Sequence, residues 1–417
     1  MKRIALIFII GRENKYSVNS LVGAIESFDD NFFDIFVVDY RKQDVCQGIN
    51  RISVNYNTLV FAFSFMTHQY WDIKNLVEEL KSTFRDAIFV CGGPHASGKP
   101  ESVATLGFDY VFIGESEITF KNFFQNILNS MEGDLSKQGN KDGVSFITSV
   151  QFVNLNEFSP VSIKYNRFGP IEISRGCPYR CAYCQTPSIF GRNIRHRDIE
   201  SVIDIVRHMV FLGMKDIRFI APNAIAFGSE DGIKINLDKV ENLLYCVRKE
   251  IGEDGRIFFG SFPSEIRPEN ISIDAIKLIK SYCNNKNIVI GAQSGSSRVL
   301  KLLKRGHTVE DVINAVDIII SNGLNANVDF IFGLPFEKDE DVEVTIKFIS
   351  KLVKMGARIH GHYFLPLPGT VLERETLKIF EKYEDFIHKE LLPNGHIFGN
   401  WERQKELSYK IHELLLY

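Results

Sequence analysis

The stretch Arg175-Gly-Cys177-Pro-Tyr-Arg-Cys181-Ala-Tyr-Cys184 places three cysteines on one short loop, with the spacing C-x3-C-x2-C. It directly follows an apolar, β-prone run at 170–174. Three thiolates on such a loop can hold three irons of a four-iron, four-sulfur cluster. The fourth iron then has no protein ligand, and a substrate or cofactor can coordinate at an open metal position. The sequence therefore predicts a [4Fe-4S] cluster held by Cys177, Cys181 and Cys184.

A disulfide framework and a structural zinc site fit these cysteines less well. The disulfide framework is disfavoured because the chain is long and its seven cysteines are an odd number. A structural zinc site takes four ligands, commonly from two C-x2-C pairs. The remaining cysteines form no such pair: Cys46, Cys91, Cys246 and Cys283.

Composition and charge are typical of a globular protein. The chain has 417 residues, enough for two or three domains, and is 45% hydrophobic and 24% charged. The net charge of −3 gives no electrostatic argument for binding nucleic acid. No apolar run is long enough to predict a transmembrane helix, and the apolar start fits a buried strand better than a signal peptide. Unpaired cysteines and an oxygen-sensitive cluster predict a cytoplasmic location.

Residues 1–130 alternate apolar, strand-like runs with amphipathic helical stretches. Continuous apolar strands between helices predict a parallel sheet covered on both faces, which is a doubly wound, Rossmann-like fold. Such folds bind ligands outside the carboxyl ends of their strands. The expected strands are 4–10, 33–38, 58–63, 87–91 and 110–113, and the expected helices include 18–27, 73–84 and 118–128.

Small and polar residues follow three of these strands. Glycines at strand ends let the backbone approach a bulky ligand closely. The sequence therefore predicts a ligand-binding edge, to which the third strand contributes Ser64, the fourth contributes Gly92, Gly93, Pro94 and His95, and the fifth contributes Gly114 and Glu115.

Residues 131–167 differ in composition from the flanking segments. The run 133–143 is polar and glycine-rich, which indicates a linker. Two short β-prone runs follow at 144–147 and 150–153, and we expect them to pair as a hairpin.

From residue 168 a strand–helix alternation repeats six times, which predicts a (β/α)6 partial barrel over 168–370. In such barrels, active-site residues lie on the loops after the strands. Residues 371–417 are charged and aromatic, and we expect a short helical C-terminal segment there. The expected barrel strands are 171–174, 217–221, 257–261, 288–292, 327–332 and 358–364.

The cysteine spacing and the six-unit barrel resemble the radical S-adenosylmethionine (radical SAM) superfamily. This resemblance covers about 168–370 and implies that the open iron binds S-adenosylmethionine and that the reduced cluster cleaves it to a 5′-deoxyadenosyl radical. It also implies an electron donor such as ferredoxin or flavodoxin. Tyr183 matches the aromatic position before the third cysteine, where packing near adenine and shielding of the cluster are both implied.

Three further barrel segments are compared with that family. Gly291-Ala-Gln293-Ser294-Gly-Ser is similar to its Gly-x-Glu-Ser-Gly-Ser stretch, and implies Gln293 and Ser294 as contacts to the ribose and the methionyl carboxylate. Asn223 stands where the family usually has Gly-Gly-Glu, so it either receives the amino group or caps a turn. Ser264 and Glu265 lie at the expected barrel mouth and are candidates for holding the carboxylate or ribose, while neighbouring Arg267 is either functional or a surface ion pair.

His360 and His362 share one face of the sixth expected strand, because side chains alternate with a period of two. If that face is inward, they are candidate catalytic residues that act on substrate protons or bind an anion. If Tyr363 is inward instead, the two histidines are packing residues.

The Gly-Gly-Pro-His-Ala-Ser stretch at 92–97 resembles the cobalamin-binding domain that precedes many radical SAM domains. The histidine motif of the first loop is absent at 11–16, so the resemblance implies cobalt bound without a histidine lower ligand. A Rossmann-like domain that binds no cobalamin is the alternative.

The combination predicts a cobalamin-dependent radical SAM methyltransferase. In the commonest scheme, methylcobalamin sits between the two domains, and a substrate carbon radical captures its methyl group. The alternatives are a radical SAM enzyme that performs cyclisation, oxidation or rearrangement, and a non-enzymatic iron–sulfur or cobalamin sensor. A small molecule, a lipid, a peptide and RNA all remain open as the substrate.

Overall fold

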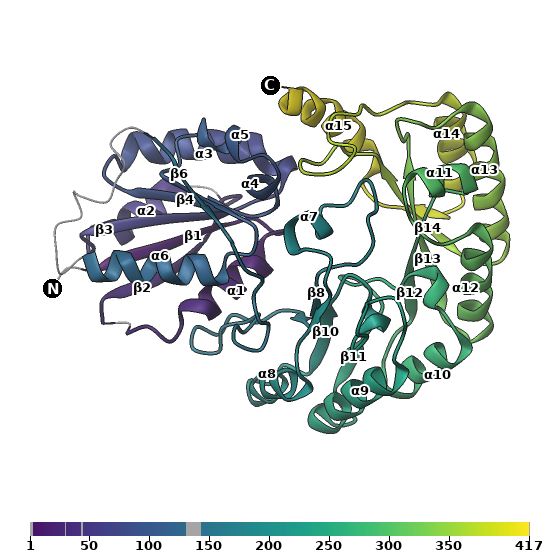
Figure 1. Cartoon of the computed structure of the whole chain (residues 1–417), viewed down its shortest axis with the longest axis horizontal. Coiled ribbons are helices and arrows are strands. Elements are labelled where there is room, and N and C mark those ends of the chain that lie inside the picture. The colour runs from purple at the N-terminus through teal and green to yellow at the C-terminus, as the bar shows by residue number, and fades with distance from the viewer. Residues whose placement is uncertain (1–2, 30, 43–44, 131–142, 417) are drawn as a thin grey trace. The chain divides into compact units, whose positions relative to one another are not determined.

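The computed structural model describes residues 3–29, 31–42, 45–130 and 143–416. Contacts divide the chain after Gly169 into an N-terminal unit and a barrel unit (Figure 1). Most of the glycine-rich run expected to be a linker lies outside the described residues.

The N-terminal unit contains a six-stranded, fully parallel sheet in the order β2-β1-β3-β4-β5-β6. The doubly wound fold is confirmed, since the strand order reverses between β1 and β3. The central strand, β1, is apolar throughout and almost wholly buried, as expected for a strand covered on both faces. The strands are β1 (Ile4–Ile10), β2 (Phe33–Asp39), β3 (Thr58–Ser64), β4 (Ile88–Gly92), β5 (Tyr110–Ile113) and β6 (Ser145–Thr148).

Helices cover both faces of this sheet. On one face α1 (Lys15–Ile25) packs against α6 (Glu117–Ser130), and Phe8 and Phe120 lie in the core beneath them. Helices α2 (Val45–Ser53) and α3 (Tyr70–Thr83) also contact each other, and the short helices α4 (Pro94–Gly98) and α5 (Pro100–Ala104) connect β4 to β5 (Figure 1).

The hairpin expected at 144–153 is wrong. Strand β6 pairs in parallel with β5, with Tyr110 opposite Ser145, and residues 150–153 form no strand. Without β6, strand β5 would be the edge of the sheet and its backbone N–H and C=O groups on that side would be unpaired. Strand β6 pairs with these groups. Residues 143–169 accordingly group with the N-terminal unit.

The barrel unit contains the six expected strands, so the partial-barrel prediction is confirmed. Together with one further strand, β15, they form a three-stranded sheet, β11-β10-β7, and a four-stranded parallel sheet, β12-β13-β14-β15. The two sheets are joined by an isolated parallel bridge between Ile266 and Ile290 and by a hydrogen bond from Val289 N to Gly260 O. The strands are β7 (Ile171–Glu172), β10 (Asp216–Ile220), β11 (Arg256–Phe258), β12 (Asn287–Gln293), β13 (Asn325–Phe332), β14 (Arg358–Tyr363) and the unforeseen β15 (Ile397–Phe398).

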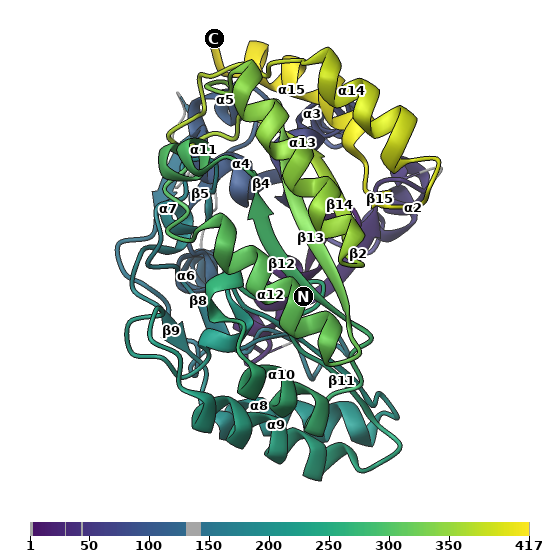
Figure 2. The same ribbon diagram turned by 90° about the vertical axis from the view of Figure 1, so that its right-hand side faces the viewer.

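Helices lie outside these strands (Figure 2). Their apolar sides cover the outer face of the sheet, where Val328 and Phe330 of β13 are fully buried. The intervening side chains of β13 are only half-buried because they face inward onto a cavity. The main helices are α8 (Ile199–Phe211), α9 (Leu237–Ile251), α10 (Ile273–Tyr282), α11 (Ser297–Leu302), α12 (Val309–Ser321) and α13 (Asp339–Lys354).

The C-terminal segment is part of the barrel unit. It contains α14 (Glu381–Phe386), a π-helical turn η5 (Ile387–Leu391) and α15 (Trp401–Leu416). Helix α15 contacts β14, where the Gln404 side-chain oxygen accepts a hydrogen bond of 2.9 Å from Tyr363 N. The segment therefore completes one side of the barrel.

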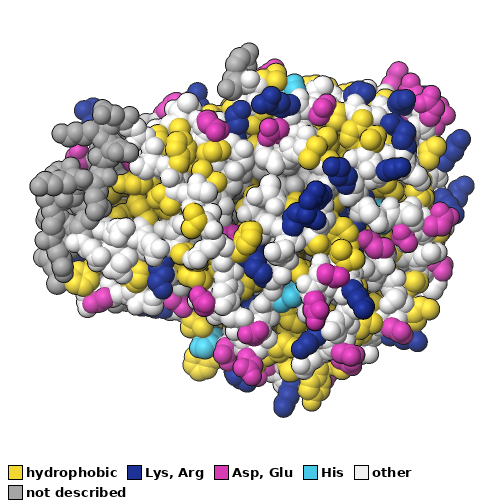
Figure 3. All heavy atoms as spheres, viewed as in Figure 1, with side chains coloured by type: hydrophobic (Ala, Val, Ile, Leu, Met, Phe, Trp, Pro, Cys, Tyr) yellow, Lys and Arg dark blue, Asp and Glu magenta, His cyan; other side chains and the backbone are white. Residues whose placement is uncertain are grey.

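The face of the barrel unit seen in Figure 3 carries Lys and Arg side chains interspersed with Asp and Glu side chains. This agrees with a chain whose net charge is close to zero. In the described ranges, no helix combines the length and apolar character needed to cross a membrane.

Candidate functional site

The barrel unit encloses a cavity of about 1420 Å³. It is lined by the inward faces of the strands and by the loops after them. The three cysteines of the sequence motif line it, and so do the lumen residues Asp329, His360 and His362. The structure thus joins the predicted cluster loop and the predicted catalytic histidines in one cavity.

The cysteine loop leaves a short antiparallel pair, β8 (Ser174–Arg175) with β9 (Arg195–His196). A side chain at Gly176 is excluded, because its φ is +86° and a Cβ there would lie 2.3 Å from Asn193 O. Hydrogen bonds from Cys177 N to Gly191 O (3.1 Å) and from Cys184 N to Cys181 O (3.0 Å) fix the turn. The backbone therefore holds the thiols toward the cavity.

The donor set fits a four-iron cluster and not a single ion. All three thiols are free and line the cavity, but their sulfur atoms do not all lie within 4.8 Å of one another. One metal ion requires such closeness, whereas three thiolates that bind three different irons stand further apart. Cys177, Cys181 and Cys184 would hold the cluster.

Arg305 connects this loop to β12 and was not foreseen from the sequence. It is buried and donates hydrogen bonds to Cys181 Sγ (3.7 Å), to the Tyr183 hydroxyl (3.1 Å) and to Gly291 O (2.7 Å). One arginine among 49 basic residues carries no local sequence signal.

Gln293 has a left-handed backbone, with φ of +69°, at a register shift between Gly291 and Gln293. Such a conformation is uncommon for a residue other than glycine and is found at functional sites. A Cβ built on Gly291 would fall 2.6 Å from Gln293 Nε2, 3.0 Å from Arg305 and 3.1 Å from Glu265 Oε2. Three polar side chains thus converge over a glycine on the cavity wall.

Glu265 is a half-buried carboxyl that faces the cavity. Burial raises its pKa to about 7, with Arg305 opposing the rise and the Asp329 charge adding to it. Its carboxyl group accepts no hydrogen bond from the residues that the structure describes. It is therefore a group that can hold or release a proton near neutral pH.

Three of the expected contacts to S-adenosylmethionine form hydrogen bonds within the protein instead: Ser264, Ser294 and Asn223. Ser264 accepts from Ala221 N and donates to Phe219 O, and Ser294 accepts from Ser296 N. Of these, only Ser264 lines the cavity.

Asn223 accepts from Arg267 N and donates to Asn270 Oδ1 at 2.8 Å. Its side chain does not line the cavity and instead ties two loops together, and it makes no side-chain capping hydrogen bond to the turn that follows it. Arg267 is not a surface residue either: it is buried, it pairs with Glu269 at 2.5 Å and it stacks on Tyr179.

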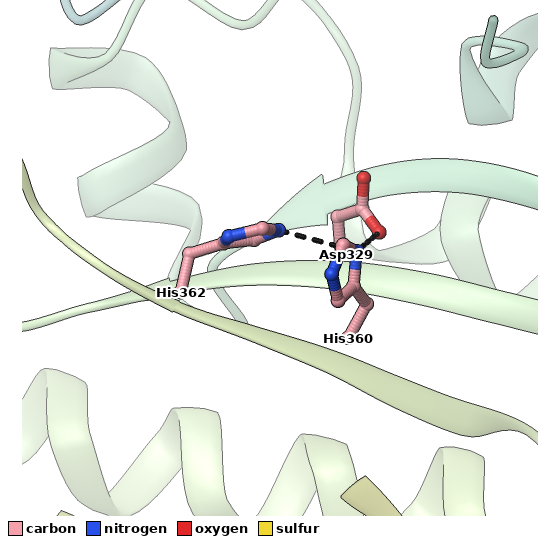
Figure 4. Close-up of side chains that lie close together, drawn as sticks. All are labelled: Asp329, His360 and His362. Atoms are coloured by element: carbon pink, nitrogen blue, oxygen red, sulfur yellow. Dashed lines mark hydrogen bonds and ion pairs between the residues drawn. The ribbon is translucent and has the colours of Figure 1, made fainter. Parts of the chain in front are cut away.

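His360 and His362 line the cavity with half-buried side chains that turn toward each other (Figure 4). Tyr363 also borders the cavity, but it is only 2% exposed. Asp329 is directly opposite His360 in the β13–β14 register, and its Oδ1 lies 3.0 Å from His360 Nδ1. Burial, reinforced by the neighbouring His360, lowers the pKa of His362 to about 4. Asp329 was not predicted as a site residue from the sequence, although it is a carboxylate between two apolar residues of β13.

The carboxyl edge of the N-terminal sheet carries the other predicted residues. Ser64 ends β3, and its hydroxyl lies 2.9 Å from that of Ser17. Gly93 has φ of +94°, and a Cβ there would lie 2.8 Å from Phe65 N. Gly92 has room for a Cβ, and Pro94 begins α4.

The remaining residues of this edge support the loops. His95 is fully buried, its two ring nitrogens lie 3.1 Å and 3.0 Å from the hydroxyls of Thr67 and Ser102, and burial lowers its pKa to about 4. Glu115 accepts from Val153 N, and Gly114 N donates to the Ser97 hydroxyl. Both nitrogens of His95 thus lie at hydrogen-bonding distance from hydroxyls of neighbouring segments.

This edge fits a bulky macrocycle held by backbone. Small residues end three neighbouring strands, and a ligand at such an edge meets main-chain groups directly. Ser64, Gly92 and Gly93 are the residues that would lie against cobalamin, while His95, Gly114 and Glu115 shape the loops.

Family comparisons agree with this division of the chain. The B12 binding domain model matches residues 20–124, and the Radical SAM superfamily model matches residues 171–349. The two matches define a class of enzyme that combines a cobalamin-binding domain with a radical SAM domain. Residues 171–349 thus form a radical SAM domain and residues 20–124 a B12-binding domain, and the cofactors of these two domains are a [4Fe-4S] cluster, S-adenosylmethionine and cobalamin.

Curated relatives fall into two groups. An uncharacterized methyltransferase of Pyrococcus horikoshii is 26% identical over 76% of this chain and 70% of its own length. A tRNA-2-methylthio-N(6)-dimethylallyladenosine synthase of Buchnera aphidicola is 32% identical, over 48% of this chain and 44% of its own length. The chain thus spans less than half of the second relative.

Solved structures share the fold. The radical S-adenosylmethionine methyltransferase TsrM from Kitasatospora setae, with tryptophan substrate and a SAM analogue bound, superimposes with a TM-score of 0.65. It is 18% identical, and the match covers 89% of this chain and 76% of TsrM. The cobalamin-dependent radical enzyme OxsB gives a TM-score of 0.59 at 16% identity, over 84% of this chain and 52% of OxsB.

Proposed function

We propose that this enzyme transfers a methyl group from S-adenosylmethionine, by way of cobalamin, to an unactivated carbon of its substrate. The observation that carries the proposal is the cavity that joins the cluster loop to the polar barrel lumen, in a chain that also has a cobalamin-binding domain. The printed names of the Pyrococcus horikoshii relative and of TsrM, both methyltransferases, support it.

When bound, the cofactors supply the radical and methyl-transfer chemistry. The chain's own residues position and shield them. Cys177, Cys181 and Cys184 hold the cluster, and Arg305 ties their loop to the strand that carries Gln293. The amide of Gln293 presents donors and an acceptor to the cavity, which suits ribose hydroxyls and a carboxylate.

Glu265 is the group placed to handle protons in the cavity. The raised pKa of Glu265, about 7, lets it exchange a proton near neutral pH. His360 and His362 are proposed to contact the substrate, which is a small molecule, lipid or peptide. An electron donor such as ferredoxin or flavodoxin and a cytoplasmic location complete the proposal.

The test uses the anaerobically reconstituted full chain with reductant and S-adenosylmethionine carrying a deuterated methyl group. Incubation with a small-molecule extract should yield 5′-deoxyadenosine, S-adenosylhomocysteine and a product that contains the label. The Cys177→Ala, Cys181→Ala, Cys184→Ala variant should yield no 5′-deoxyadenosine.

Two outcomes would overturn the proposal. Formation of 5′-deoxyadenosine without S-adenosylhomocysteine or labelled product would indicate cyclisation, oxidation or rearrangement. Intact S-adenosylmethionine in a chain loaded with cluster and cobalamin would indicate a sensor.

A further inference from the structure

A carboxylate and two imidazoles converge in the barrel lumen. Asp329 of β13 and His360 of β14 are register partners, and His362 lies two residues further along the same face of β14. Figure 4 shows the three side chains turned toward one another. Their ligand atoms all lie within 4.8 Å of one another, and no other such group of His, Cys, Asp or Glu is found in the described ranges of the chain.

The spacing matches the edges of a metal coordination shell. His360 Nδ1 lies 3.0 Å from Asp329 Oδ1 and 3.2 Å from His362 Nε2. Two ligands about 2.1 Å from one ion, at about 90–109° to each other, are about 3.0–3.4 Å apart. His360 Nδ1 is therefore placed as a neighbouring corner of one shell to both Asp329 and His362, and the third pair of atoms lies within 4.8 Å.

Hydrogen bonding satisfies this group only if one proton on His360 Nδ1 is shared between Asp329 and an unprotonated His362 Nε2. If neutral His360 carries its proton on Nδ1, it donates to Asp329 and has no lone pair for His362. If it does not, it accepts from His362 and turns a lone pair toward the Asp329 carboxylate. A cation removes the conflict, because all three atoms then direct lone pairs to it.

The surrounding structure holds the rings in place. Phe398 of β15 stacks on the His360 ring, with centroids 4.7 Å apart and planes 6° from parallel. A Cβ on Gly399 would lie 3.1 Å from His360 Cδ2, so the backbone closes against the ring. The aspartate and His360 side chains keep 15% and 30% of their surface exposed, toward the cavity.

We propose that Asp329, His360 and His362 bind a divalent first-row metal ion, separate from the iron–sulfur cluster. Two histidines and one carboxylate suit Zn²⁺ or Fe²⁺ and leave further coordination positions open. Those positions face the cavity and take water or an oxygen donor of the substrate. The site is independent of methyl transfer, since it requires only these three side chains.

Gln404 is a positioning residue for this site. Its Nε2 lies 3.4 Å from His362 Nδ1, and its oxygen accepts from Tyr363 N. Metal binding through His362 Nε2 places a proton on Nδ1, which needs an acceptor, whereas the Gln404 amide nitrogen that faces it is a donor. A carboxylate at position 404 would accept from both N–H groups.

The experiment measures Zn²⁺ binding to the full chain, by competition with a chromophoric chelator, in a background with Cys177, Cys181 and Cys184 changed to Ala. One zinc ion per chain is expected, with nitrogen and oxygen but no sulfur neighbours by X-ray absorption. His360→Gln with His362→Gln should weaken binding by at least tenfold, and Gln404→Glu should strengthen it. Asn327→Ala, on the same face of β13, should leave it unchanged.

Equal zinc affinity with and without the two histidines would overturn the proposal, as would sulfur ligation or no uptake at micromolar zinc. Iron content of the two-histidine variant with its cluster cysteines restored reports whether the barrel still folds. Because none of these readouts involves S-adenosylmethionine or cobalamin, failure of the proposed methyl transfer leaves the metal test intact.

Discussion

At the scale of single residues, neighbouring positions in one motif have different tasks. Gln293 lines the cavity in a left-handed conformation, whereas the Ser294 hydroxyl accepts from Ser296 N and does not reach the cavity. The family resemblance assigned both to S-adenosylmethionine. The structure separates them, because the register shift at Gln293 turns adjacent side chains in different directions.

Gln293→Ala should weaken S-adenosylmethionine binding by about tenfold, since leaving a buried polar partner unpaired costs about 1–3 kcal/mol. Ser294→Ala should leave affinity unchanged and lower the free energy of unfolding by about 1 kcal/mol. Anaerobic calorimetry on the cluster-loaded chains measures the affinities. An unaltered affinity in Gln293→Ala would place the nucleoside contacts elsewhere.

His95 makes the stability of the N-terminal unit depend on pH. Its folded pKa is about 4, below the ordinary value of 6.5, so the unfolded chain binds a proton first as the pH falls. The free energy of unfolding should therefore drop between pH 6.5 and 4, by about 2 kcal/mol at pH 5.

The measurement is the urea-unfolding midpoint of the full chain at pH 7.5 and pH 5. His95→Gln removes the titrating group, so its midpoint should change less over this range than that of the wild type. The same loss in both chains would mean that other groups cause the pH dependence.

At the scale of elements, the turn between β4 and α4 depends on two adjacent glycines with different constraints. Gly93 has a positive φ and no space for a Cβ, whereas the nearest atom to a Cβ on Gly92 would be 3.4 Å away. Only Gly93 is required by the fold. Gly92 is available for close approach of a ligand.

Gly93→Ala should lower the free energy of unfolding by at least about 1 kcal/mol, because a left-handed conformation is costly for a residue with a Cβ. Gly92→Ala should keep wild-type stability and weaken cobalamin binding. Thermal unfolding and cobalamin titration separate the two effects. Wild-type cobalamin affinity in stable Gly92→Ala would contradict the assignment of this edge.

At the scale of the whole molecule, the chain combines a cobalamin-binding domain with a radical SAM domain. The first loop of the cobalamin-binding domain contains no histidine that could ligate cobalt. Residues 11–16 contain none, and both nitrogens of His95 lie at hydrogen-bonding distance from hydroxyls. Cobalamin in this enzyme should therefore be bound without a histidine lower ligand.

Electron paramagnetic resonance of the Co(II) form in the full chain tests this. The signal should lack superhyperfine splitting from an axial histidine nitrogen. Such splitting would refute the ligation claim, and absence of cobalamin binding at micromolar protein would refute the assignment of the N-terminal domain to cobalamin. The His95→Gln variant should give the same spectrum as the wild type.

Most of the fold followed from local patterns. Apolar, β-prone runs between helical stretches predicted twelve of the strands that the structure contains, six in the N-terminal sheet and six in the barrel, because such runs depend on neighbouring residues. The cysteine spacing identified the cluster loop for the same reason, since its three ligands lie on one turn. The partners of β6 and the existence of β15 did not follow, because a short strand depends on the sheet edge it meets.

The cavity chemistry depends instead on residues that are distant in sequence. Arg305 reaches Cys181 across 124 positions, and Asp329 meets His360 across 31. A charged or polar side chain carries no sign of its partner until packing brings the two strands or loops together. The cluster loop and the two-domain architecture were thus readable from the chain, whereas the Asp329–His360–His362 group arises from the register in which β13 and β14 pair.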